Sequence, residues 1–200
     1  HQSLAEKYRI SKYIDIIKQD AAVEEIKKFI KEFPKKKAMI LYGPAGTGKT
    51  SLALAAAREN ELEVLELNSS DLRNRVKLEA ILKPAAEQRS LFKKGKILLV
   101  DEVDGVTGTD IGGISEIIRL LESTKFPIIM TCNDVCQSKL SQLRQKCKIV
   151  EMKTLQTATI FGILKKIAEK EGMRKEDESL QKIAIKSQGD IRAALNDLQS

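Results

Sequence analysis

Eight residues from Gly43 to Thr50, GPAGTGKT, have the G-x-x-x-x-G-K-[ST] spacing of a loop that wraps a chain of phosphates. Glycines at this spacing let the backbone curl, so that its N–H groups converge on phosphate oxygens. Lys49 brings a positive charge to the outer phosphates, and Thr50 offers a hydroxyl to Mg²⁺. The pattern predicts nucleotide binding, with a purely structural glycine turn as the alternative, by Gly43, Pro44, Ala45, Gly46, Thr47, Gly48, Lys49, Thr50 and Ser51.

Two carboxylates, Asp101 and Glu102, follow an apolar run at residues 97–100 that is typical of a buried strand. Ligands of open α/β sheets bind at the carboxyl ends of the strands, so we expect both side chains to face the loop. Asp101 is suited to hold Mg²⁺, and Glu102 is suited to polarise an attacking water as a catalytic residue. Ordinary turn chemistry at a strand end is the other interpretation.

Two further polar residues are candidates for contacts with the phosphates. Asn133 follows the apolar run 127–131, and its amide would orient the attacking water or touch the last phosphate. Arg192 opens the last predicted helix, from which its guanidinium would reach the phosphates. The alternatives are a turn-forming asparagine and a surface arginine.

The elements that must position these residues alternate between strands and helices up to about residue 153, and only helices follow. This order predicts an α/β fold, a five-stranded parallel P-loop sheet at residues 1–153 with a small C-terminal helical lid at 154–200. The strands are expected at 38–42, 63–67, 97–100, 127–131 and 148–152. The helices are expected at 21–33, 51–57, from after residue 71 to about 92, 115–121, 158–171, 179–187 and 190–198.

The charge of the chain is +7 and is unevenly distributed. Between residues 73 and 96, eight basic residues face two acidic ones, which suits a nucleic-acid backbone or simply a solvated helix face. No apolar run approaches the roughly 20 residues that a membrane span needs, so we expect no membrane partner. Cys132, Cys136 and Cys147 lack the paired spacing of a zinc site, and with no secretion signal they favour a reducing compartment.

Four segments together resemble the AAA+ ATPases. GPAGTGKT, ILLVDEVDG, TCND and GDIRAALNDLQ are similar to the phosphate loop, Walker B, sensor 1 and sensor 2 of that class. AEKYRISKYIDII, ELNSSDLRNR and DEVDG resemble its clamp-loader branch, and most closely the large subunit of archaeal-type replication factor C. The resemblance covers nearly the whole chain. It implies an ATPase that works in a multi-subunit complex and drives opening and loading of a sliding clamp in DNA replication.

The resemblance also implies partners and a place in the cell. The cofactors would be ATP or ADP with Mg²⁺, and the partners would be clamp-loader small subunits, the sliding clamp and primer–template DNA. Clamp-loader subunits continue into a helical collar, so this sequence would be the ATPase module without it. An archaeal protein of this kind is cytoplasmic, and a eukaryotic one is nuclear. The alternatives are a nucleotide-dependent scaffold with negligible hydrolysis, or another AAA+ machine.

Individual residues acquire roles through the same resemblance. Leu91 and Phe92 lie where a contact with the clamp is expected, although ordinary helix packing would also explain them. Lys146 stands where small subunits carry an arginine that reaches the neighbour's ATP site, and Arg144 is nearby as a substitute. Packing around adenine is implied for Tyr8, Arg9, Ile16 and Ile17, and contact with the DNA backbone for Arg73, Arg75 and Lys77.

Overall fold

A computed structural model describes residues 2–8, 20–68, 72, 75–87, 94–105 and 113–200. Its strands form one sheet in the order β2-β3-β4-β1-β5, and every pairing is parallel. The strands are β1 (Ala38–Tyr42), β2 (Leu62–Asn68), β3 (Gly95–Asp101), β4 (Ile128–Cys132) and β5 (Lys148–Glu151). The predicted five-stranded parallel sheet is confirmed, with strand bounds that differ by at most two residues.

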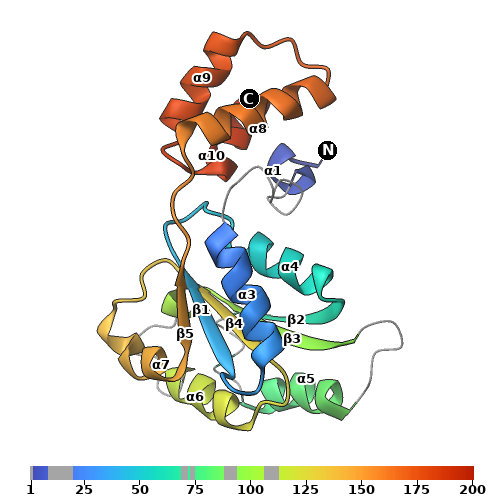
Figure 1. Cartoon of the computed structure of the whole chain (residues 1–200), viewed down its shortest axis with the longest axis vertical. Coiled ribbons are helices and arrows are strands. Elements are labelled where there is room, and N and C mark those ends of the chain that lie inside the picture. Colours follow the sequence, from blue (N-terminus) through green and yellow to red (C-terminus); the bar gives the residue numbers. More distant parts are fainter. Residues whose placement is uncertain (1, 9–19, 69–71, 73–74, 88–93, 106–112) are drawn as a thin grey trace.

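Helices cover both faces of this sheet (Figure 1). Around the sheet lie α3 (Asp20–Glu32), α4 (Lys49–Glu59), α5 (Arg75–Glu87), α6 (Gly113–Ser123) and α7 (Ser141–Lys146), with 3₁₀ turns η3 (Val103–Gly105) and η4 (Ser138–Leu140). Beyond β5 come α8 (Thr157–Lys170), α9 (Asp177–Lys186) and α10 (Ile191–Gln199), while α1 (Leu4–Lys7) is the short helix near the start of the chain.

Successive strand residues supply two separate hydrophobic clusters, because side chains alternate between the faces of a sheet. In β3, Ile97 and Leu99 join the cluster under α3 and α4. Leu98 and Val100 join the cluster under α5, α6 and α7. All four side chains are buried. The unbroken apolar run at residues 97–100 is therefore explained, as predicted, by burial on both faces of the sheet.

A third cluster forms the C-terminal lid and includes the start of the chain. Leu4 and Tyr8 are buried among residues of α8, α9 and α10. The Leu4 N–H donates to Gln199 Oε1 at 3.0 Å, which ties α1 to α10. In Figure 1 the chain runs from β5 into α8, and α1 lies beside the lid. Packing of the first residues on the lid was not part of the sequence prediction, which divided the chain at residue 153.

One helix is described only in part, and another was not predicted. The described part of the helix after β2 spans Arg75–Glu87, while residues 88–93, into which the prediction continued to about residue 92, lie outside the described part of the chain. Helix α7 was not predicted, because a six-residue helix whose only buried side chain is Leu143 carries no readable apolar period. Among the described helices, none is both long enough and apolar enough to cross a membrane.

Candidate nucleotide site

The loop at residues 43–48 joins the carboxyl end of β1 to the first turn of α4. Gly48 is the N-cap of α4 with φ +82°, a left-handed conformation that favours glycine. Lys49 and Thr50 therefore begin the helix, and the positive end of its dipole points at the loop. This strand–loop–helix setting favours the binding of an anion.

Lys49 connects the loop to the end of β4. Its side chain is buried, and its Nζ donates to Gly43 O at 2.7 Å, Pro44 O at 3.0 Å and Asn133 Oδ1 at 3.0 Å. Burial lowers the pKa of Lys49, while the nearby carboxylates of Asp104 and Glu102 oppose that shift. The structure thus brings together two residues that the sequence singled out separately, Lys49 and Asn133.

Thr50 and Asp101 meet at the same edge of the sheet. Thr50 Oγ1 donates to Asp101 Oδ1 at 2.7 Å, which joins the first turn of α4 to the end of β3. A hydroxyl and a carboxylate side by side are hard oxygen ligands. Mg²⁺ is usually held by one or two protein oxygens of this kind together with substrate phosphates. The two side chains therefore fit the metal predicted for them.

Asp104 is a residue that the sequence analysis did not single out. Its Oδ2 accepts the backbone N–H of Asn133 at 3.0 Å and that of Asp134 at 3.4 Å. The Asp104 carbonyl accepts from Lys139 Nζ at 2.5 Å. These bonds tie the turn after β3 to the chain after β4, so Asp104 fixes the backbone that carries Asn133. The only sequence signal was a third acidic residue close behind Asp101 and Glu102.

Comparison with known proteins agrees with this geometry. Residues 39–155 match the family described as "ATPase family associated with various cellular activities (AAA)", and residues 162–200 match the "RCF1/5-like, AAA+ ATPase lid domain". The first match alone covers more than half of the chain. The chain belongs to the AAA family of ATPases.

The AAA chain is also similar to proteins named replication factor C large subunit. It is 46% identical to that of Staphylothermus marinus over 199 residues, 97% of this chain and 47% of that protein. It is 42% identical to that of Thermofilum pendens over 201 residues, 98% and 49% of the two chains. It is 42% identical to that of Aeropyrum pernix over 200 residues, which are 97% of this chain and 42% of that protein. The chain spans about half the length of the curated relatives it matches.

The lid of the AAA chain touches the phosphate loop through Asp190. Gly46 has φ +79°, a left-handed conformation that favours glycine, and a Cβ there would lie 2.0 Å from Asp190 Oδ1, so a larger residue would have to displace that side chain. Asp190 is the N-cap of α10, and its Oδ1 accepts the Ala193 N–H at 3.0 Å. Arg192, predicted to reach the phosphates from the lid, is the second residue of this helix and is exposed. Asp190 therefore joins the lid to the loop, and the role of Arg192 stays a prediction.

Tyr8, predicted to pack against adenine, lies in the lid cluster of the AAA chain. Its hydroxyl donates to Glu171 Oε1 at 2.5 Å, and Lys7 Nζ lies 2.7 Å from the same oxygen. The hydrogen bond from Lys7, then that from Tyr8, lowers the pKa of the Glu171 carboxyl. Arg9, Ile16 and Ile17 lie outside the described residues.

The residues predicted to contact DNA or the clamp fall mainly outside the described structure. Arg73, Leu91 and Phe92 are not among the described residues. Arg75 and Lys77 belong to the first turn of α5, with no description of their side chains. Their neighbour Val76 is 77% exposed, so this turn presents at least one side chain to solvent. The predicted DNA contacts therefore stay predictions.

Arg144 and Lys146 were the two candidates for a cation that reaches a neighbouring ATP site. Arg144 Nη1 donates to the carbonyls of Val135 and Gln137, the second at 3.0 Å, so its guanidinium holds the loop that follows β4. Lys146 Nζ lies 3.8 Å from Glu122 Oε1 on the surface. Arg144 of the AAA chain thus has a structural role within its own subunit.

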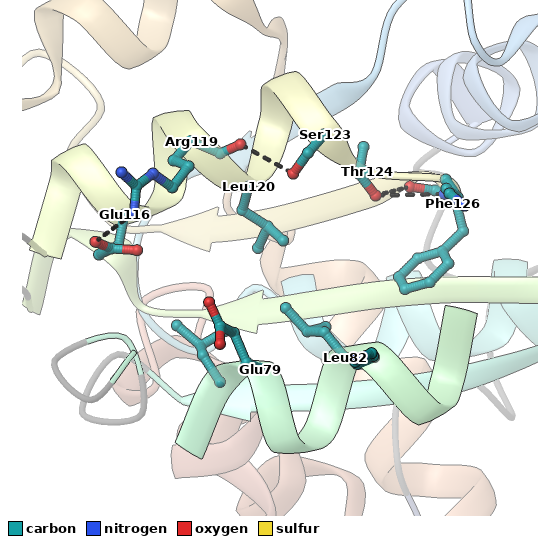
Figure 2. Close-up of a pocket in the computed structure, with 11 residues that line it drawn as sticks. Glu79, Leu82, Glu116, Arg119, Leu120, Ser123, Thr124 and Phe126 are labelled. Atoms are coloured by element: carbon teal, nitrogen blue, oxygen red, sulfur yellow. Dashed lines mark hydrogen bonds and ion pairs between the residues drawn. The ribbon is translucent and has the colours of Figure 1, made fainter. Parts of the chain in front are cut away.

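A pocket of about 270 Å³ lies between α5 and α6 of the AAA chain, away from the phosphate loop (Figure 2). Leu82 from α5 and Leu120 from α6 extend into it, and Phe126 lies at one end. Phe126 precedes β4, so this end of the pocket lies at the amino ends of the strands. The nucleotide residues lie at the opposite, carboxyl ends. The pocket is therefore not part of the nucleotide site.

Proposed function

We propose that this chain is the ATPase module of a sliding-clamp loader and acts as its large subunit in DNA replication. ATP binding would favour the assembly that grips and opens the clamp, and hydrolysis after contact with primed DNA would release it. One observation carries the proposal. The loop lysine is bonded to Asn133 after β4, and Thr50 beside it is bonded to the Walker B residue Asp101, in a chain similar to replication factor C large subunits over nearly its whole length.

In this proposal different side chains bind the phosphates of ATP, hold Mg²⁺ and activate the attacking water. The loop N–H groups and Lys49 bind the phosphates, while Thr50 and Asp101 would hold Mg²⁺, which neutralises charge on the phosphates. Glu102 accepts the proton of the attacking water, and Asn133 orients that water toward the last phosphate. Arg192 lies at the start of α10, the helix whose N-cap touches the loop, and would reach the bound nucleotide when the lid closes.

The proposed partners are the small subunits of the loader, the sliding clamp and primer–template DNA. The archaeal organisms of the relatives support a cytoplasmic location. The bonds of Arg144 within its own loop support a position at which this subunit does not complete a neighbour's ATP site with that residue. We also propose that the chain divides into an ATPase domain at residues 1–153 and a helical lid at residues 154–200.

A clamp-loading assay tests the proposed function. The protein that contains this chain is assembled with small subunits from the same organism, and retention of labelled clamp on primed circular DNA is measured. We expect loading that requires ATP and is lost with Lys49→Ala. If Lys49→Ala instead prevented assembly of the complex, the nucleotide would be a structural ligand of a scaffold. Loading independent of this chain would contradict the proposal.

A further inference from the structure

A buried hydroxyl, that of Thr131, lies at the centre of the candidate site beside Asp101 and Glu102. Thr131 is 2% exposed in β4, where Ile128, Ile129, Met130 and Cys132 are all fully buried. A hydroxyl in such surroundings is unfavourable unless it is hydrogen-bonded, and a valine of the same shape would fit an apolar strand better. The polar atom at this position therefore needs an explanation from its contacts.

Both hydrogen bonds of the Thr131 hydroxyl go to the end of β3. Its Oγ1 donates to Asp101 Oδ1 at 3.1 Å and accepts the backbone N–H of Glu102 at 3.0 Å. The single O–H of a threonine is used by the first bond. Asp101 Oδ1 also accepts from Thr50 Oγ1, so one carboxylate oxygen joins the phosphate-loop helix to β4.

The Glu102 backbone has an uncommon conformation at this point. Its φ is +55°, in the left-handed region that costs a residue with a Cβ about 1 kcal/mol or more. The paired register of β3 and β4 ends at Val100 and Met130. Just beyond it the Thr131 side chain, rather than the backbone ladder, holds the Glu102 N–H. The hydroxyl thus secures the turn from which the Glu102 side chain projects.

We propose that Thr131 is a positioning residue for Mg²⁺–ATP chemistry at this site. Its hydroxyl fixes the Asp101 carboxylate as a metal ligand and holds the left-handed backbone that aims Glu102. This inference rests on the proposed function, since it gives Thr131 a task in ATP hydrolysis. A purely structural threonine would affect stability but would leave the metal dependence and the turnover number of the site unchanged.

Two matched pairs of variants isolate the hydroxyl. Thr131 and Thr131→Val differ in one hydroxyl against one methyl, and Thr131→Ser and Thr131→Ala differ only in the hydroxyl. The complex that contains each variant is assayed for kcat, KM for ATP and the Mg²⁺ concentration at half-maximal rate. We expect Thr131→Val and Thr131→Ala to lower kcat about 10–100-fold and to raise the Mg²⁺ requirement, as loss of a residue that orients a metal ligand does. KM for ATP should rise together with the Mg²⁺ requirement, and Thr131→Ser should retain most of the activity.

Two readouts do not depend on turnover. Hydrogen exchange at the Glu102 amide should be faster in Thr131→Val than in wild type, and faster in Thr131→Ala than in Thr131→Ser, because its acceptor is lost. Calorimetry with ATP should show that Mg²⁺ improves binding less in Thr131→Val and Thr131→Ala, while binding in the absence of Mg²⁺ is unchanged. If the wild-type complex hydrolysed no ATP, the proposed function would fail, and these readouts would still decide the role of Thr131.

Two results would overturn the inference. Equal kcat and equal Mg²⁺ dependence within both pairs would show that the hydroxyl does not affect the site. A loss shared by Thr131→Ser and Thr131→Ala would assign the effect to packing of the methyl group. If Thr131→Val failed to fold, the pair Thr131→Ser and Thr131→Ala would decide in the same way, because it leaves the volume of the side chain nearly constant.

Discussion

Lys49 Nζ donates a hydrogen bond to Asn133 Oδ1 at 3.0 Å, so the phosphate-loop lysine is already bonded to the residue that follows β4. The other two donors of this ammonium group go to the carbonyls of Gly43 and Pro44. A bound phosphate must therefore displace at least one protein acceptor from Lys49. The neutral Asn133 amide is the acceptor that lies outside the loop, directly after β4, so it links nucleotide binding to β4.

Replacement of Asn133 by alanine should separate binding from turnover. We expect Asn133→Ala to bind ADP about as well as wild type, because the loop and Lys49 remain, and to hydrolyse ATP about 100-fold more slowly, because water is no longer oriented. Nucleotide titration and steady-state turnover of the assembled complex measure the two effects. Asn60→Ala, at the C-cap of α4, is the matched control and should leave turnover unchanged. Wild-type turnover in Asn133→Ala would remove the residue from the reaction.

Removal of the Glu102 charge should stop hydrolysis without loss of ATP binding. Glutamine keeps the size of the side chain but is a much weaker base, so we expect Glu102→Gln to lower turnover at least 100-fold. Single-turnover hydrolysis and ATP titration of the same preparation give the comparison. Glu66→Gln, an exposed position on β2, serves as the control. If Glu102→Gln turned over like the control, another group would have to be the base.

Asp104 is predicted to act through the backbone of Asn133. Alanine at this position leaves the N–H groups of Asn133 and Asp134 without their acceptor, whereas asparagine keeps an oxygen there. Asp104→Ala should therefore reduce turnover more than Asp104→Asn, and should lower the free energy of unfolding by about 1–3 kcal/mol. Urea unfolding and turnover of both variants test this order. Equal behaviour of the two variants would show that the hydrogen bonds do not matter.

The cysteines give a prediction about alkaline pH. Burial raises the pKa of Cys132 and of Cys147 to about 12, while Cys136 is exposed. Unfolded thiols lose their protons near pH 9, and the folded chain keeps them. The free energy of unfolding should therefore fall between pH 9 and about 12, by about 1.4 kcal/mol per pH unit for each buried thiol.

Two measurements check the thiol prediction. Urea unfolding from pH 8 to pH 10 should show a shallower decline in Cys147→Ala than in wild type, because one buried thiol is gone. Ellman's reagent at pH 8 should react quickly with Cys136 alone in the native chain and with all three thiols in denaturant. Rapid reaction of Cys132 or Cys147 in the native chain would contradict their burial.

The sequence predicted the parts of the site whose spacing is local. The loop from Gly43 to Thr50 and the pair Asp101 and Glu102 are contiguous, so their pattern could be read directly. Thr131, Asp104 and Asp190 could not be recognised, because their roles depend on which strands are neighbours and on how the lid meets the loop. The bond from Glu102 to Thr131 spans 29 positions, and that from Tyr8 to Glu171 spans 163. Such contacts follow from tertiary packing rather than from periodicity.

Hydrolysis of ATP by this chain within a clamp loader is best tested by ATP turnover of the assembled complex, with and without the sliding clamp and primed DNA, using Lys49→Ala in this chain as the reference. We expect strong stimulation that needs both the clamp and the DNA, and a reduced response in Lys49→Ala. Turnover that is indifferent to the clamp and to DNA would contradict it.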